Sequence, residues 1–109
     1  MATLTVETIV RTGLEPTKNA VSASDVFAND GRTVIRVDNQ NAGTLVVTIV
    51  TPNSIDGDLA IPDRTVSILT TEDRIIGPFP KANYNDGDAN VTVNFDTTSS
   101  VTCEVLKYP

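Results

Sequence analysis

The sequence contains no histidine, and its only cysteine is Cys103. Without histidine, the catalytic triads that use this side chain as a general base are excluded. A single cysteine cannot form an intramolecular disulfide, and Cys103 has neither a histidine to activate it nor a second cysteine to share a metal ion. The glycine motifs of phosphate-binding loops, dinucleotide-binding folds and nucleophile elbows are also missing. We therefore expect a protein that is not an enzyme and that binds no cofactor.

Clusters of positive charge and long apolar runs are missing as well. The chain has 8 Lys and Arg residues against 14 Asp and Glu residues, which gives a net charge of -6, and the basic residues are scattered singly. Nucleic acids and anionic membranes attract basic surfaces, so neither is expected as a partner. The longest apolar run, 45–50, is interrupted by Thr48 and is far shorter than the roughly 20 residues that cross a bilayer. Residues 1–5 lack the features of a secretory signal, so we expect the protein to stay in the cytoplasm that makes it until it is used.

Aromatic residues are scarce, at 5% of the sequence, and tryptophan is absent. Valine, isoleucine, leucine and threonine must therefore fill the core, and most of these residue types favour β-strands. The apolar fraction of 39% is too high for a disordered chain. A length of 109 residues predicts one folded domain over residues 1–109.

Alternation of apolar and polar residues is clearest in residues 31–52. Thr33, Ile35 and Val37 share one side of an extended chain, and the pattern resumes at 45–49 after a polar break at 39–43. This period of two indicates strands with one buried face. The asparagines and the glycine of the break tolerate positive φ, so we expect the two strands to pair as an antiparallel hairpin.

The last strands of the chain show an equally regular pattern. Val91, Val93 and Phe95 alternate with polar residues, and the pattern resumes over 101–107 after the polar segment 97–100. This predicts a second hairpin. Cys103 lies in phase with the valines of the final strand, so we expect a small buried side chain at this position.

Four further segments complete the predicted fold. Residues 2–11 alternate as a first strand, and 20–27 are expected to form a short strand or an irregular edge. Residues 64–69 predict a strand with Val66 and Ile68 facing inward. The segment from Arg74 starts as a strand, but its prolines argue for an edge position or an early end. With about seven or eight short strands separated by turns such as 83–88, the chain is predicted to be an all-β antiparallel β-sandwich or jelly-roll-like barrel.

Carboxylates gather in two loops, Asp56-Gly57-Asp58 with Asp63, and Asn85-Asp86-Gly87-Asp88. Oxygen-rich loops of this kind can bind Ca²⁺, but neither has the spacing of a known calcium loop. Asp-Gly is also a common way to make a tight turn, so we favour turns over metal sites. No metal ligand is therefore assigned.

A few apolar residues fall outside the regular alternation and suggest a binding surface. Aromatic side chains held by neighbouring prolines suit such a surface, because ordering them costs little entropy. Alternatively, Phe79 plugs one end of the sandwich, since a core with so few aromatics needs each of them. The candidate contact residues are Leu14, Pro16, Pro78, Phe79, Pro80, Tyr84 and Tyr108.

Three segments of the sequence resemble small proteins that are encoded beside the major capsid gene of tailed bacteriophages. These segments are Leu14-Glu15-Pro16-Thr17 with the following Asn-Ala-Val-Ser-Ala-Ser-Asp, Asn29-Asp30-Gly31-Arg32-Thr33, and 72–80, EDRIIGPFP. The resemblance implies a virion structural protein that decorates or cements the capsid. It also implies that the chain binds the major capsid protein on the outer surface of the shell, as a homo-oligomer and most often a trimer.

Two other functions are compatible with an acidic β-sandwich that lacks catalytic residues. One is an accessory protein at the head-to-tail junction or along the tail. The other is a carbohydrate-binding module, which would need exposed aromatic residues and often Ca²⁺. The expected localisation under the main hypothesis is the capsid surface of the virion, after synthesis in the host cytoplasm.

Overall fold

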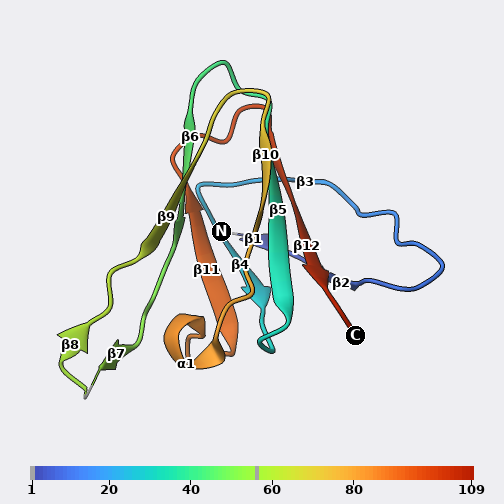
Figure 1. Ribbon diagram of the computed structural model, residues 1–109. Coiled ribbons are helices and arrows are strands. Elements are labelled where there is room, and N and C mark those ends of the chain that lie inside the picture. Colours follow the sequence, from blue (N-terminus) through green and yellow to red (C-terminus); the bar gives the residue numbers. More distant parts are fainter. Residues whose placement is uncertain (1, 56) are drawn as a thin grey trace.

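The computed structural model describes residues 2–55 and 57–109 and consists of two β-sheets packed face to face (Figure 1). The first sheet has the strand order β1-β4-β11-β6-β9, and the second has the order β10-β5-β12-β2, with β3 also paired to β12. The strands of the first sheet are β1 (Ala2–Thr3), β4 (Ser24–Ala28), β11 (Asn90–Phe95), β6 (Leu45–Ile49) and β9 (Arg64–Ile68). Those of the second are β10 (Asp73–Ile76), β5 (Thr33–Asn39), β12 (Val101–Lys107), β2 (Val6–Thr8) and β3 (Asn19–Ala20). A small hairpin of β7 (Ser54–Ile55) and β8 (Leu59–Ala60) extends from the sandwich.

The order of the strands is that of a jelly roll. With β1 and β2, which pair in parallel with their neighbours, set aside, the sheets are β4-β11-β6-β9 and β10-β5-β12-β3, and all neighbouring strands in them are antiparallel. Almost every connection crosses from one sheet to the other, and only β6 and β9 follow each other within a sheet. Two intertwined Greek keys produce this pattern. The predicted all-β sandwich is therefore confirmed.

Both predicted hairpins are wrong. β5 pairs with β10 and β12, whereas β6 pairs with β11 and β9, so the two strands lie in opposite sheets. β11 and β12 are separated in the same way. The cause is that alternation shows which face of a strand is buried but not which strand lies beside it. Each connecting loop spans the roughly 10 Å between the facing sheets instead of turning within one sheet.

The predicted first strand over 2–11 is divided into two. β1 pairs in parallel with β4 of the first sheet, and β2 pairs in parallel with β12 of the second, so the sheets are mixed rather than purely antiparallel. Leu4 lies at the crossing between them and is only 5% exposed. The N-terminal segment therefore joins both sheets at one side of the sandwich.

The core lies between the sheets and is built from the alternating residues of the central strands. The inward-facing sets predicted for β5, β6, β11 and β12 are all buried, and Cys103 is among them. Ile68 of β9 is buried and Val66 packs against the core, as predicted. Burial of each such side chain contributes roughly 1.5–3 kcal/mol to folding. The buried apolar residues are Leu4, Val21, Phe27, Ile35, Val37, Leu45, Val47, Ile49, Ile68, Phe79, Val91, Val93, Phe95, Val101, Cys103 and Val105.

β10 is an edge strand that ends before Pro78, which confirms the prediction drawn from its prolines. Gly77 follows with a φ of 130°, and a Cβ at this position would lie 3.1 Å from the Thr33 carbonyl oxygen and the Val34 Cα. Only glycine fits this close approach without displacing β5. The chain then forms α1 (Lys81–Tyr84), a single helical turn within a region where only a turn was predicted. Such a short helix has no periodic signal in the sequence.

Candidate functional site

The seven predicted contact residues do not form one surface. Leu14 and Pro16 lie half-buried in the long loop 9–18, which extends on the side of the sandwich away from α1 (Figure 1). Tyr108 follows β12 near the C-terminus and is exposed. Pro78, Pro80 and Tyr84 lie together with Phe79 around α1. A single contact surface can therefore include only part of the predicted set.

Phe79 is a core residue rather than an exposed anchor, because it is only 3% exposed. Its ring centroid lies 5.8 Å from that of Phe27 and 5.4 Å from that of Tyr84. Asn29 donates a hydrogen bond from Nδ2 to the Phe79 carbonyl oxygen at 2.9 Å. The alternative interpretation, that this ring plugs one end of the sandwich, is the correct one. With so few aromatics in the chain, three of them form one cluster.

A groove lies beside this aromatic cluster, between α1 and the first residues of β9. It consists of two adjoining cavities of 470 and 410 Å³, which share Arg64, Asn83 and Tyr84 in their walls. The first continues along residues 61–65, and the second continues along residues 76–80. We call this feature the α1 groove. The sequence did not predict it, because its two walls come from segments far apart in the chain.

Hydrogen bonds hold the wall of the α1 groove that Thr51 and residues 61–63 form. The Thr51 backbone N–H and Oγ1 donate to Asp63 Oδ1 at 2.9 and 3.1 Å, and Thr51 Oγ1 also lies 2.7 Å from the Ile61 carbonyl oxygen. Asn53 Nδ2 donates to the carbonyl oxygens of Ala82 and Asn85 at 2.7 and 2.9 Å. These bonds connect the chain after β6 to α1. The groove is therefore formed before any ligand arrives.

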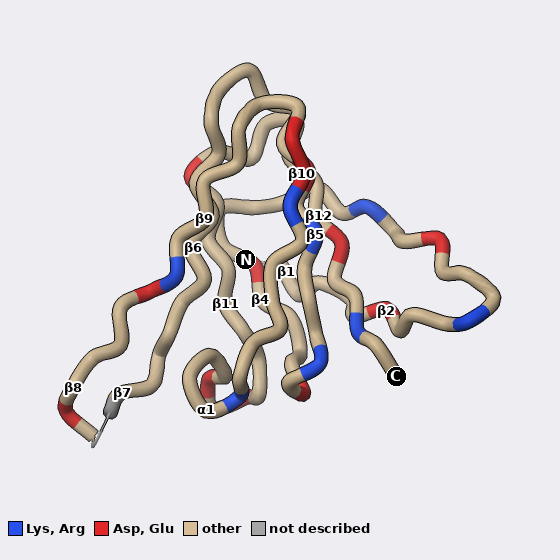
Figure 2. Tube along the Cα trace, viewed as in Figure 1, with Lys and Arg blue, Asp and Glu red and all other residues tan. Residues whose placement is uncertain are grey.

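Arg64 is the charged residue common to both cavities. It is exposed, and no Asp or Glu among the described residues lies within 4.0 Å of its guanidinium. Apart from Arg64, the Lys and Arg residues of the described strands all belong to the second sheet, and the others lie in loops and in α1 (Figure 2). The α1 groove thus contains one positive charge, from Arg64, and one carboxylate, that of Asp63, in the wall of its first cavity.

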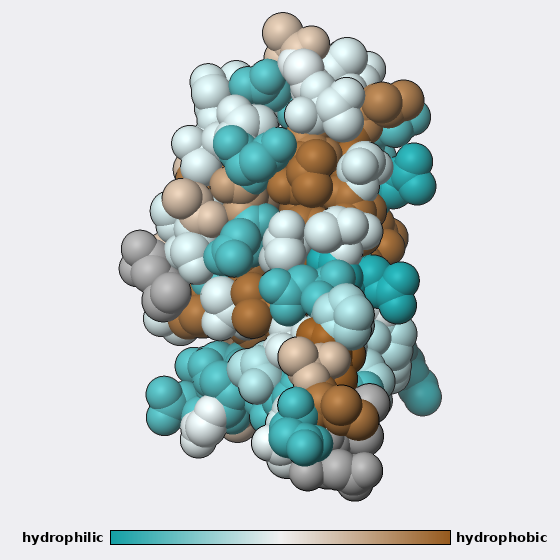
Figure 3. Space-filling view, turned by 90° about the vertical axis from the view of Figure 1, so that its left-hand side faces the viewer, coloured by the Kyte–Doolittle hydropathy of each residue, from teal (hydrophilic) through white to brown (hydrophobic). Residues whose placement is uncertain are grey.

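Two open sheet edges lie next to the groove. β9 ends the first sheet and β10 ends the second, and among the described strands each pairs on one side only. Residues 69–72 join them directly, so both edges lie on the same side of the sandwich; we call this side the β9–β10 edge. Leu69 and Ile75 are 55% and 68% exposed there. Figure 3, which views the molecule from the side of β9, shows hydrophobic side chains reaching the surface between hydrophilic ones.

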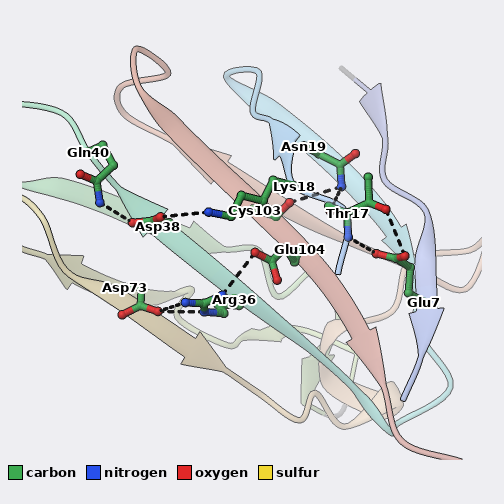
Figure 4. Close-up of polar contacts among 10 residues, drawn as sticks. All are labelled: Glu7, Thr17, Lys18, Asn19, Arg36, Asp38, Gln40, Asp73, Cys103 and Glu104. Atoms are coloured by element: carbon green, nitrogen blue, oxygen red, sulfur yellow. Dashed lines mark hydrogen bonds and ion pairs between the residues drawn. The ribbon is translucent and has the colours of Figure 1, made fainter. Parts of the chain in front are cut away.

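The outer face of the second sheet carries a row of charges across three strands (Figure 4). Arg36 of β5 donates from Nε to Asp73 Oδ2 at 2.8 Å, and its Nη1 lies 3.4 Å from Glu104 Oε1. The hydrogen bond with Asp73 raises the pKa of Arg36 above its usual value. Glu104 is only 2% exposed, and its Oε2 atom has no hydrogen-bond partner. Glu104 alternates with the inward-facing Cys103 and Val105, so the pattern of the strand does not predict its burial.

The 9–18 loop begins and ends beside this row of charges (Figure 4). Thr17 donates to the Glu7 carboxylate from its backbone N–H at 2.8 Å and from Oγ1 at 3.2 Å. Lys18 Nζ lies 4.0 Å from Asp38 Oδ2. These contacts attach the end of the loop to the second sheet. At its start, the Ile9 backbone N–H donates to the Lys107 carbonyl oxygen at 2.7 Å, so Leu14 and Pro16 lie between the two attachments.

Of the two acidic loops predicted from the sequence, the first is described only in part, because Asp56 lies outside the described residues. Asp86 Oδ1 accepts hydrogen bonds from the backbone N–H groups of Asp88 and Asn90 at 2.8 and 3.0 Å, as an aspartate does in a tight turn. Within residues 2–55 and 57–109, no group of three or more Cys, Asp and Glu side chains gathers as metal ligands would. No helix in the described part of the chain has the length and apolar character needed to cross a membrane.

The three segments that resemble phage virion proteins occupy different parts of the fold. The first spans the end of the 9–18 loop, β3 and the start of β4, and the second is the turn between β4 and β5. The third, 72–80, forms β10 and one wall of the α1 groove. Comparisons of the chain with protein-family models, with curated proteins and with solved structures find no match.

Proposed function

We propose that this chain is a non-enzymatic structural protein of a tailed-phage virion, which docks on the outer surface of the major capsid shell and stabilises it. The observation that supports docking best is the β9–β10 edge, where two open strands lie on the same side of one sandwich. Open strands are a ready site for pairing with another protein. Leu69 and Ile75 add exposed apolar surface at the same place. The resemblance of three sequence segments to phage virion proteins supports the identity of the partner.

Under this proposal the chain stabilises the capsid shell by adding contacts between its subunits. Each docked copy buries apolar surface and pairs backbone groups with the major capsid protein. Expansion of the shell or pressure from packaged DNA must then break these contacts as well as the contacts within the shell. A homo-oligomer, most simply a trimer, would bind several capsid subunits at once and gain avidity from the linked sites.

The state of Cys103 agrees with a non-enzymatic role. Burial raises the pKa of its thiol to about 12, and the nearby Asp25 and Glu104 carboxylates add to this effect. A nucleophilic cysteine requires the thiolate form near neutral pH. Cys103 instead acts as an apolar residue of the core.

The decisive experiment measures binding of the purified chain to phage particles assembled without it. The wild-type chain is expected to co-sediment with the particles at a fixed stoichiometry. The double variant Leu69→Lys, Ile75→Lys should lose at least about 10-fold in occupancy, because lysine at an open edge opposes strand pairing. Val10→Lys is the matched control, since Val10 is 47% exposed but follows β2 at the opposite end of the second sheet. Circular dichroism verifies that both variants remain folded.

The outcomes separate the alternatives. Unchanged occupancy of the double variant would remove the β9–β10 edge from the proposal. Electron microscopy that finds the chain at one vertex or along the tail would replace decoration with an accessory role. A chain that is monomeric by light scattering and does not bind the particles would overturn the proposed function.

A further inference from the structure

The charge of Arg64 indicates what kind of group the α1 groove receives. Arg32, Arg36 and Arg74 each have an ion pair, with N···O distances of 3.5, 2.5 and 3.6 Å. Arg64 has no such partner among the described residues, although it borders both cavities of the groove. A guanidinium can bind a carboxylate through two parallel hydrogen bonds. In a chain with a net charge of -6, this open arginine favours an anionic group from a partner.

The neighbouring sheet edge indicates the shape of the ligand. β9 begins at Arg64 and, within the described part of the chain, pairs only with β6. Its other side therefore offers alternate backbone N–H and C=O groups, which an extended peptide can satisfy. The α1 groove opens next to these same residues and continues beyond Tyr84. An extended chain could thus pair with β9 and place side chains in the groove.

The groove is built to accept such a chain with little rearrangement. Asn53 holds α1 through the Ala82 and Asn85 carbonyl oxygens, at 2.7 and 2.9 Å. The Asp63 carboxylate, which adjoins Arg64 in the sequence, is hydrogen-bonded to Thr51 instead. The Asp63 carboxylate therefore forms no ion pair with the Arg64 guanidinium, although both residues line the same cavity. A preformed site lowers the entropy cost of binding.

We propose that the α1 groove binds an extended segment of a partner protein, which adds as a strand to β9 and places an Asp or Glu carboxylate on the Arg64 guanidinium. The inference rests on the proposed function and deepens it, because it names the chemistry of the capsid segment that docks. Alternate side chains of the added strand enter the groove, where Tyr84 provides an aromatic wall. The remaining side chains face solvent.

The experiment is selection from a random dodecapeptide display library on the immobilised wild-type chain. Selected peptides should contain Asp or Glu within a β-forming sequence. When these peptides are synthesised with a fluorophore, their affinity measured by anisotropy should fall roughly 10-fold or more for Arg64→Gln. Arg11→Gln is the matched control, because Arg11 is also exposed and has no ion pair among the described residues, but it lies in the 9–18 loop, away from α1. Amide chemical shifts should change at β9 and at Asn83.

Several results would overturn the inference. These are selected peptides without carboxylates, equal affinity for wild type and Arg64→Gln, or no selected peptides at all. An oligomer that dissociates in Arg64→Gln would assign the groove to a second copy of the chain instead. Failure of the inference can be distinguished from failure of the proposed function. If Arg64→Gln still binds particles with full occupancy, only the binding role of the α1 groove is rejected. If the wild-type chain does not bind particles but binds acidic peptides, only the capsid as the partner is rejected.

Discussion

Asp30 is the carboxyl group whose pKa the structure clearly lowers. Its Oδ2 lies 3.0 Å from Lys107 Nζ, and its Oδ1 accepts the Arg32 backbone N–H at 3.0 Å. The hydrogen bond from Lys107, followed by that from Arg32, lowers the pKa of Asp30 from 3.8 to about 2. The folded state thus favours the carboxylate. Its contribution to stability is present above pH 3.8 and is lost as the pH falls through about 2.

The prediction for Asp30 follows from its contact with Lys107. Lys107→Met should move the pKa of Asp30 up towards 3.8, and it should weaken the loss of stability between pH 4 and 2. Carboxyl carbon NMR titration measures the pKa directly. Lys18→Met is the control, because Lys18 lies beside Asp38 rather than Asp30. If the pKa of Asp30 stays near 2 in Lys107→Met, the ion pair is not its cause.

Cys103 should resist thiol reagents while the protein is folded. Burial raises the pKa of the thiol to about 12, so very little thiolate exists at pH 8. Labelling by a disulfide reagent should be at least roughly 100-fold slower than in denaturing urea. A Cys103→Ala, Ser99→Cys variant, whose thiol is placed at an exposed position, should label quickly in both conditions. Fast labelling of the native wild type would contradict burial of this side chain.

At the scale of single residues, the burial of apolar side chains could be predicted from the sequence, whereas the burial of polar side chains could not. Alternation placed Cys103 and Ile68 inside correctly, because a strand has only two faces. The buried side chains of Asp25 and Glu104 depend instead on hydrogen bonds and covering segments that are distant in sequence. Phe79 lies outside any alternating pattern in the sequence, and only its contacts with Phe27 and Tyr84 reveal its role in the core.

At the scale of elements, three loops that connect the sheets meet at one end of the sandwich (Figure 1). Asn39 is fully buried there and donates from Nδ2 to the carbonyl oxygens of Gly43 and Ile68, both at 3.0 Å. Its Oδ1 accepts the Asn41 backbone N–H at 3.0 Å. Asn41 in turn donates to the Ser99 carbonyl oxygen at 2.9 Å. The asparagines predicted to make a hairpin turn therefore connect all three loops.

Asn39→Ala should lower the free energy of unfolding by about 2–4 kcal/mol, because it leaves a buried carbonyl oxygen and other polar groups without partners. Urea denaturation followed by circular dichroism measures this change. Gln40→Ala is the neighbouring control and should cost no more than about 0.5 kcal/mol, since Gln40 is exposed. Equal effects of the two substitutions would show that the Asn39 network contributes little.

The existence of the main strands could be predicted from the sequence, whereas their pairing and the α1 groove could not. β5 and β6 follow each other closely, yet the loop between them crosses between sheets, and Asn39 at its start forms backbone hydrogen bonds with Thr71 and Glu72 of the β9–β10 connection. The groove depends on this crossing topology, since its walls come from Thr51, residues 61–65, residues 76–80 and residues 83–84. Local patterns carry no signal for contacts at such separations.

At the scale of the whole molecule, the two sheets share one apolar core. Leu4 packs into that core at the point where the chain crosses from β1 to β2. A residue that contacts both sheets at their common side should affect both together. This arrangement predicts that the chain unfolds as one cooperative unit, as the length of the sequence also suggested.

The substitution Leu4→Ala tests this cooperativity. It should lower the free energy of unfolding by about 2–4 kcal/mol through the cavity that it leaves. Transitions followed by far-ultraviolet circular dichroism and by tyrosine fluorescence should still coincide, because loss of Leu4 weakens both sheets equally. Val10→Ala, at an exposed position, is the control and should leave the transition nearly unchanged. Two separate transitions in Leu4→Ala would instead show that each sheet keeps a stability of its own, and that the N-terminal crossing is what joins them.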